Sequence, residues 1–282
     1  MYAITGITGK VGGAVASNLL AAGKPVRAVL RDAGKAAFWR DQGCDITLAE
    51  MADAGALTAA FRGAEAVFIL PPPVFDPAPG FPEIRAVIAA LTAALAAAQP
   101  ARVVHLSTIG AQARQPNLLS QQGLVEQALR QLTMPVSTLR PAWFMENFAW
   151  DVASAREEGM LPSFLQPLDR AIPMAATADI ARLAADLLLR SGNENCIVEL
   201  MSAAVSPEAA AATFAAILGR DVIARAVPRE SWGALFKAQG MRDPMPRIQM
   251  LDGFNEGWLA FDDPAHVVQG STTLETVLRG LA

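Results

Sequence analysis

The sequence is poor in the side chains that carry most enzyme chemistry. Its 282 residues include two cysteines, two histidines and a single tyrosine, Tyr2. Cys44 and Cys196 lie far apart, without the spacing of a zinc site or a disulfide framework. We therefore predict no metal site and a reducing compartment, the cytoplasm. No Ser-His-Asp arrangement or closely spaced pair of carboxylates stands out, which gives hydrolase chemistry little support.

Long runs of one charge and long apolar runs are also absent. The net charge is −4 and no stretch is rich in lysine or arginine, which disfavours nucleic acid as a partner. The most apolar stretch, residues 86–98, falls short of the roughly 20 residues that a membrane helix needs. It predicts a buried helix and gives no reason to expect a membrane partner. Because the chain starts on a strand-like segment, we expect no signal peptide.

Hydrophobic residues make up 52% of the chain, which is enough for a large core. In the first half, short β-branched runs alternate with Ala- and Leu-rich stretches of helical length. The β-branched runs are residues 2–5, 25–30, 44–49, 65–70, 101–107 and 134–140. Strands that alternate with helices form parallel sheets with right-handed crossovers. We therefore predict an α/β fold with a doubly wound, Rossmann-type parallel sheet.

The second half of the chain has a different rhythm. Further helices are predicted at residues 177–190 and 206–219, and further strands at residues 196–200 and 222–227. The helix at 206–219 has a good N-cap serine, a proline at its first position and a glycine after its last turn. These elements predict a smaller, interleaved C-terminal α/β lobe.

Three glycines follow the first predicted strand at intervals of three residues. Gly6, Gly9 and Gly12 lie between this strand and a predicted helix that ends near Gly23. In a dinucleotide-binding turn, the first glycine makes the tight bend and the second lets the backbone approach a pyrophosphate. The third allows the helix to pack closely on the sheet, and the helix N-terminus favours the anion. The stretch therefore predicts a dinucleotide cofactor.

The end of the second predicted strand indicates which dinucleotide is bound. NAD sites usually place an acidic residue there for the ribose 2′-hydroxyl, but Leu30 and Arg31 stand at this point. Arg31, with Lys35 nearby, suits a 2′-phosphate and favours NADP, with NADPH preferred over NADH. Asp32 is the competing candidate for an NAD-type contact.

The same signals predict how the chain divides into domains. We expect an NAD(P)-binding Rossmann domain over residues 1–142, to which residues 175–200 contribute. A smaller substrate lobe is expected over residues 143–174 and 201–282.

Five stretches resemble the NmrA-like branch of the atypical short-chain dehydrogenases/reductases. They are TGITGKVG (5–12), RAVLRD (27–32), AVFILPPP (66–73), VVHLSTIGA (103–111) and TLRPAWFMEN (138–147). The resemblance implies an NAD(P)-binding sheet, a small substrate lobe and a cleft where the strand ends meet that lobe. The branch includes quinone reductases, triphenylmethane dye reductases and cofactor-sensing regulators without catalytic activity.

The resemblance also implies positions for the cofactor and the substrate. The cofactor is expected beside Gly6, Thr8, Gly9, Lys10, Val11, Gly12, Arg31, Lys35, Glu50, Met51, Leu70, Pro71, Pro72, Ser107, Thr108, Gln122, Pro141 and Phe144. The substrate is expected beside Phe75, Trp143, Phe144 and Asn147. Phe75 belongs to a proline-rich loop that is predicted to be stiff, and this loop and the residues around Trp143 can equally be structural.

The proton donor typical of short-chain dehydrogenases is missing. Their Tyr-xxx-Lys pair would fall near Leu118 and Gln122, on a helix predicted over residues 117–132. The only tyrosine is Tyr2, and residues 36–236 contain no lysine, so the pair is excluded by composition. Reduction of a simple ketone needs such an acid, which typically contributes ~10²–10⁴ in rate. A quinone, cationic dye, enone or iminium can accept hydride with water as the proton source.

Four other side chains can be considered as replacements for the missing acid. Ser107 is the candidate catalytic residue, because its hydroxyl can hydrogen-bond a carbonyl oxygen or the cofactor amide, although a structural role is equally compatible. His105 is predicted to be structural, His266 has no motif around it, and Glu126 is predicted to be an orienting or surface carboxylate. Two functions therefore remain open: an NADPH-dependent reductase of an activated small-molecule acceptor, or a non-catalytic NADP(H) sensor with a protein partner.

Overall fold

The computed structural model describes residues 1–192 and 194–282. The chain divides into two compact units. Unit 1 comprises residues 1–107, 121–140 and 180–198, and unit 2 comprises residues 108–120, 141–179 and 199–282. Among the helices of the described residues, none is both long enough and apolar enough to cross a membrane.

An eight-stranded sheet runs in the order β13-β10-β6-β5-β4-β1-β2-β3. Its strands are β1 (Tyr2–Ile4), β2 (Val26–Leu30), β3 (Asp45–Leu48), β4 (Ala66–Ile69), β5 (Arg102–Leu106), β6 (Val136–Pro141), β10 (Cys196–Met201) and β13 (Val268–Gln269). All pairings from β3 to β6 are parallel, and the strand order reverses at β1, where β2 lies on one side and β4 on the other. The predicted doubly wound parallel sheet is confirmed.

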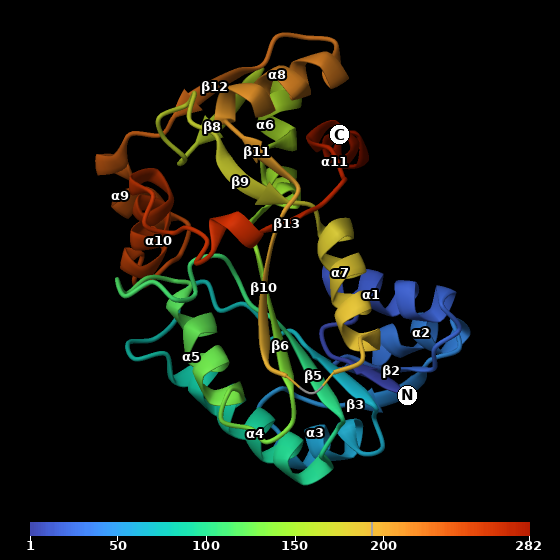
Figure 1. Cartoon of the computed structure of the whole chain (residues 1–282). Helices are drawn as coiled ribbons and strands as arrows, with labels where there is room; N and C mark the ends of the chain where they lie inside the picture. Colours follow the sequence, from blue (N-terminus) through green and yellow to red (C-terminus); the bar gives the residue numbers. More distant parts are fainter. Residues whose placement is uncertain (193) are drawn as a thin grey trace. The chain divides into compact units, whose positions relative to one another are not determined.

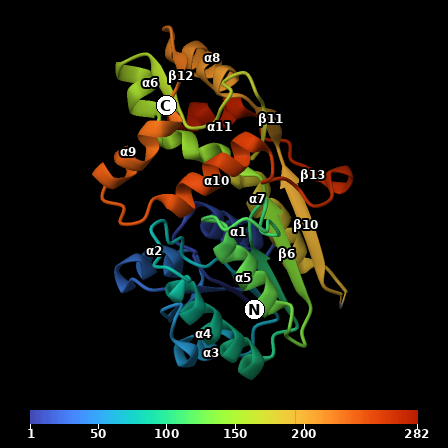
Figure 2. The ribbon, with the colours of Figure 1, turned by 90° about the vertical axis from the view of Figure 1, so that its left-hand side faces the viewer.

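Helices cover both faces of the sheet in unit 1 (Figure 1). One face carries α1 (Lys10–Ala21), α2 (Ala36–Asp41) and the unit 1 part of α7 (Thr177–Leu189). The other carries α3 (Ala54–Phe61), α4 (Pro82–Ala98) and α5 (Ser120–Leu129), which lie side by side in Figure 2. A sheet buried on both faces has nearly continuous apolar strands, and all four residues of β4 are indeed buried.

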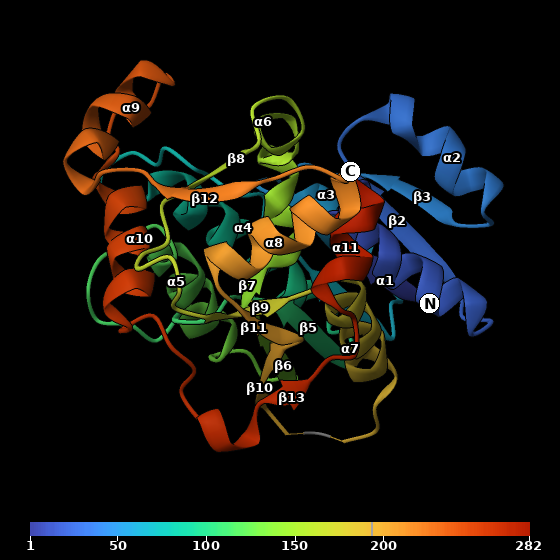
Figure 3. The ribbon, with the colours of Figure 1, turned by 90° about the horizontal axis from the view of Figure 1, so that it is seen from above.

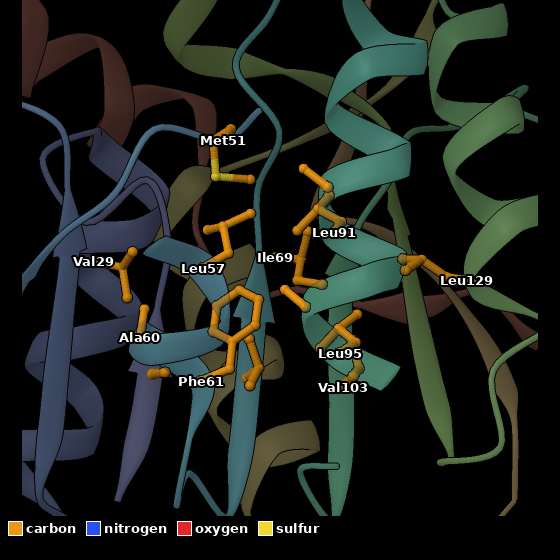
Figure 4. Close-up of a cluster of buried hydrophobic side chains, with 14 of the residues drawn as sticks. Val29, Met51, Leu57, Ala60, Phe61, Ile69, Leu91, Leu95, Val103 and Leu129 are labelled. Atoms are coloured by element: carbon orange, nitrogen blue, oxygen red, sulfur yellow. The ribbon is translucent and has the colours of Figure 1, made fainter. Parts of the chain in front are cut away.

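The core between the sheet and the α3–α5 layer is shown in Figure 4. Leu57 and Phe61 of α3 and Leu91 and Leu95 of α4 pack around Ile69 of β4 on the same face of the sheet. These five side chains are fully buried. The apolar stretch that the sequence marks as a buried helix therefore forms the greater part of α4, as predicted.

Unit 2 contains two small sheets. One has three strands in the order β11-β9-β7, and the other pairs β12 with β8 in parallel. The strands are β7 (Trp143–Phe144), β8 (Met160–Ser163), β9 (Ile172–Ala175), β11 (Ala203–Val205) and β12 (Ile223–Ala226). The helices are α6 (Val152–Glu157), α8 (Pro207–Leu218), α9 (Trp232–Ala238), α10 (Met245–Glu256) and α11 (Leu274–Leu281), and α8 lies between β12 and α11 in Figure 3.

The signals at the ends of α8 are confirmed in detail. The hydroxyl of Ser206 accepts a hydrogen bond from the Ala209 amide at 3.1 Å, Pro207 occupies the first helical position, and Gly219 adopts a left-handed φ of 66°. Each feature satisfies or avoids an unpaired backbone group at a helix end.

The helix predicted over residues 117–132 is shorter than expected. It begins at Ser120, because the Asn117 side chain accepts a hydrogen bond from the Leu119 amide and the Ser120 hydroxyl accepts one from the Asn117 amide. These bonds form a turn in place of the first helical turn. Leu118 therefore lies before α5, so its predicted place on this helix is wrong, whereas Gln122 does lie on the helix.

Candidate functional site

The glycine turn joins the carboxyl end of β1 to α1. Gly6 has a φ of +63°, which favours glycine, and its carbonyl accepts a hydrogen bond from the Gly9 amide at 3.0 Å. A Cβ atom on Gly12 would lie 2.3 Å from the carbonyl oxygen of Gly6. Only glycine at position 12 lets α1 approach the turn this closely, as the packing role assigned to this glycine requires.

The first turn of α1 offers backbone donors to a ligand. The N-cap residue is Gly9, so no side chain caps the helix, and the first turn carries no acidic residue. The N–H groups and the positive end of the helix dipole therefore favour an anion. Thr8 and Lys10 are exposed beside these groups, whereas the Val11 side chain is buried in the core.

The carboxyl end of β4 lies beside the glycine turn. The hydroxyl of Thr5 accepts a hydrogen bond from the Leu70 amide at 2.9 Å and donates one to the Phe68 carbonyl at 3.1 Å. A Cβ atom on Gly6 would lie 3.1 Å from the Leu70 side chain. Leu70 and the two prolines after it, one buried and one half-buried, therefore follow the strand next to the turn, as the sequence predicts.

The residues after β2 and β3 differ in how they are exposed. Arg31 and Lys35 are exposed, and Asp32 caps the 3₁₀ turn η1 (Ala33–Lys35) by accepting a hydrogen bond from the Gly34 amide at 2.8 Å. Glu50 is exposed, but the Met51 side chain is packed into the core of unit 1 (Figure 4). Two cations are thus free to meet a ligand at the end of β2, while one oxygen of the competing carboxylate has a local partner.

The proline-rich loop after β4 is tied to its surroundings at several points. The Gln121 side-chain amide donates to the Val74 carbonyl at 3.0 Å, and Arg85 donates to the Gly80 carbonyl at 2.8 Å. Phe75 is 54% exposed on this loop, so its ring is accessible to a ligand. A held loop that presents an exposed ring suits the predicted contact with a flat substrate, which stays a prediction.

A buried charged cluster lies at the carboxyl ends of β5 and β6. The Ser107 hydroxyl donates to Glu126 Oε1 at 2.5 Å. Arg140 binds both oxygens of the same carboxylate, at 2.9 Å through Nε and at 2.6 Å through Nη2. All three residues are at most 6% exposed. Glu126 is therefore an orienting carboxylate and not a surface residue, one of the two roles that the sequence left open.

His105 lies deeper in the same strand and is fully buried. Its Nε2 atom is 3.2 Å from the side-chain oxygen of Gln122 on α5. Burial lowers the pKa of His105 to about 4, because the interior disfavours the charged imidazolium. The ring is thus neutral near pH 7, and the predicted structural role of His105 agrees with its burial.

Tyr2 lies at the opposite end of the parallel strands from Ser107. It begins β1, and its hydroxyl donates to Glu65 at 2.9 Å, immediately before β4. The pKa of the Tyr2 phenol is raised, first because burial disfavours its charged form and second because of its hydrogen bond to Glu65. The single tyrosine therefore lies at the amino ends of the parallel strands, opposite the edge where the glycine turn and Ser107 are found.

Five predicted site residues belong to unit 2: Thr108, Pro141, Trp143, Phe144 and Asn147. The Pro141 carbonyl accepts a hydrogen bond from the Ile109 amide at 2.8 Å, and the ring of Trp143 packs edge-on against Phe254 at 5.0 Å. Phe144, Asn147 and Thr108 are half-buried. Their contacts with cofactor or substrate stay predictions.

Sequence reasoning missed the role of Arg140 and of Glu146. Glu146 accepts hydrogen bonds from the Thr177 amide and hydroxyl, at 2.9 and 2.6 Å, and so holds the start of α7. Arg140 ends a predicted strand and carries no local signal of a buried partner. Only the fold brings it to Glu126.

Comparison with known proteins agrees with this fold. The model of the NmrA-like family matches residues 2–255. NAD(P)H azoreductase of Xenophilus azovorans is 29% identical over 262 residues, covering 91% of this chain and 85% of the relative. Quinone oxidoreductase 2 of Escherichia coli strain K12 is 27% identical over 269 residues, covering 93% of this chain and 91% of the relative.

A solved structure has a similar fold over the whole chain. The NADPH-dependent quinone oxidoreductase of Escherichia coli, in complex with NADPH, superposes with a TM-score of 0.83 at 25% sequence identity. The match covers 100% of this chain and 99% of the other.

Proposed function

Because this chain belongs to the NmrA-like family, we propose that it is an NADPH-dependent reductase of an activated acceptor, by direct hydride transfer without a Tyr-Lys pair. The acceptor classes are quinones, cationic dyes, enones and iminium compounds. The observation that carries the proposal is the glycine turn at the carboxyl end of β1. Its fit to a dinucleotide is supported by the start of α1, which no side chain caps, and by the close packing of α1 on the turn, which a side chain at position 12 would prevent.

The residues of unit 1 have distinct tasks in this proposal. The amides at the start of α1 bind the pyrophosphate, and Arg31 and Lys35 bind the 2′-phosphate. NADPH, when bound, supplies the hydride. The chain positions the acceptor and excludes competing reactions, and the product takes its proton from water. The names of the azoreductase and quinone oxidoreductase relatives support acceptors of this kind.

The cofactor preference gives a first prediction. Arg31→Glu should weaken NADPH binding roughly 10- to 100-fold, because a charge-assisted bond to the phosphate is replaced by repulsion. NADH binding should change little, so the preference for NADPH should be lost. Fluorescence titration measures both affinities. Arg40→Glu, which makes the same charge change at an exposed position of α2, is the control. Equal affinities of the wild type for NADPH and NADH would contradict the assignment of Arg31.

The reaction class rests on the missing acid. With Tyr2 at the opposite strand ends and no lysine in residues 36–236, the chain lacks the usual group that protonates an alkoxide. Acceptors whose reduced products are stabilised anions or neutral molecules do not need this group.

Measuring NADPH oxidation against a panel of acceptors tests the proposal. Quinones or cationic dyes should be turned over, whereas simple unactivated ketones should not. Efficient reduction of a simple ketone would contradict the reaction class, because another group would then do the work of the tyrosine. Tight NADPH binding without oxidation by any acceptor would instead favour the alternative function, a non-catalytic NADP(H) sensor.

A further inference from the structure

The direction of one buried hydrogen bond is fixed by its partners. A carboxylate is an acceptor only, and Arg140 donates to both oxygens of Glu126. In the contact between Ser107 Oγ and Glu126 Oε1, at 2.5 Å, Ser107 must therefore be the donor. The cluster is buried, so water does not compete for this proton. What Ser107 can offer to a ligand is the lone pair of its oxygen.

The strand order indicates which part of a dinucleotide lies near Ser107. The glycine turn follows β1, and the cations proposed for the 2′-phosphate follow β2. The adenosine half is thus directed towards β2, so the nicotinamide half extends the other way, over β4 and β5. Ser107 immediately follows β5, which is two strands from β1, or about 10 Å.

We propose that Ser107 accepts a hydrogen bond from the carboxamide N–H of the nicotinamide, and that Glu126 and Arg140 are positioning residues that fix it as an acceptor. This inference rests on the proposed NADPH-dependent function. Quinone and enone groups present acceptor oxygens and no donor at the reacting centre, so they do not match Ser107. A carboxamide N–H does. Of the two hydrogen-bond partners that the sequence left open for Ser107, a carbonyl oxygen or the cofactor amide, this inference selects the cofactor amide and makes the serine the acceptor.

Two cofactor analogues separate the groups of the carboxamide. The 3-acetylpyridine analogue of NADP keeps the carbonyl and lacks the N–H, and the thionicotinamide analogue keeps the N–H and replaces the oxygen. The probe is equilibrium binding by calorimetry, which needs no acceptor and no turnover. The wild type should bind the acetylpyridine analogue about three- to tenfold more weakly than the thionicotinamide analogue.

Variants locate this discrimination at Ser107. Ser107→Ala should bind the two analogues with equal affinity, and Ser107→Thr, which keeps a hydroxyl, should restore the difference. Ser137→Ala, the same change on the neighbouring strand β6, should leave the difference unchanged. Glu126→Gln, whose amide can also donate, should reduce the difference. If that variant does not fold, the Ser107 variants still decide the question.

The outcomes of this experiment are distinct. Unchanged discrimination in Ser107→Ala, or no discrimination in the wild type, would overturn the inference while NADP binding itself still supported the proposed function. Failure of the wild type to bind NADP at all would overturn both.

Discussion

Replacing Glu126 with alanine is expected to destabilise the protein by about 3–5 kcal/mol. The substitution removes the carboxylate that Arg140 binds through two hydrogen bonds, and the guanidinium side chain is only 3% exposed. A buried ion pair often gains little over an apolar pair, but the loss of one partner leaves a buried charge poorly compensated. The free energy of unfolding, from urea denaturation of wild type and variant, measures the effect.

Two comparisons show whether burial causes this effect. Glu275 and Arg279 form a similar pair at 2.7 Å, but both side chains are 59% exposed, so Glu275→Ala should cost less than about 1 kcal/mol. The double variant Glu126→Leu with Arg140→Met removes both charges and should be more stable than Glu126→Ala alone. A loss below about 1 kcal/mol in Glu126→Ala would show that the pair contributes little to holding α5 against the end of β6.

The second large effect is expected for Gly12→Ala. The added Cβ would lie 2.3 Å from the Gly6 oxygen and 2.6 Å from the Gly6 carbonyl carbon. Both are backbone atoms, so either α1 or the turn must shift. We expect a loss of about 3 kcal/mol in stability, typical of overpacking, and a loss of NADPH binding. Thermal unfolding and fluorescence titration measure the two quantities.

A matched glycine controls for the intrinsic effect of alanine in a helix. Gly233 lies within α9, and a Cβ atom there would meet no atom within 4 Å. Gly233→Ala should therefore stabilise the protein by up to about 1 kcal/mol through helix propensity and leave NADPH binding intact. Similar behaviour of the two variants would contradict the close approach of α1 to the glycine turn.

The sheet domain could be predicted from local patterns alone. Short β-branched runs correspond to β1 to β6, and the glycine spacing placed the turn before α1. The packing role of Gly12 also follows from its position in the motif. These features depend on residues close in sequence, where periodicity and backbone conformation allow few other secondary structures.

The charged cluster could not be predicted in this way. Ser107, Glu126 and Arg140 come from a strand end, a helix and a second strand, and no spacing rule relates them. The start of α5 was misplaced because Asn117 and Ser120 bond to the backbone locally and stop the helix from beginning earlier. In unit 2, β12 was predicted as a strand over residues 222–227, but β7, with two residues, is too short for a period to be visible.

The central claim is direct hydride transfer from NADPH to an activated acceptor without a protein acid. A triarylmethane dye tests it, because reduction forms one new carbon–hydrogen bond at its central carbon. With NADPH deuterated at both C4 positions in ordinary water, mass spectrometry should find one deuterium in the reduced dye. With ordinary NADPH in heavy water, this carbon should carry none. Deuterium taken up from the solvent at the central carbon would contradict the account.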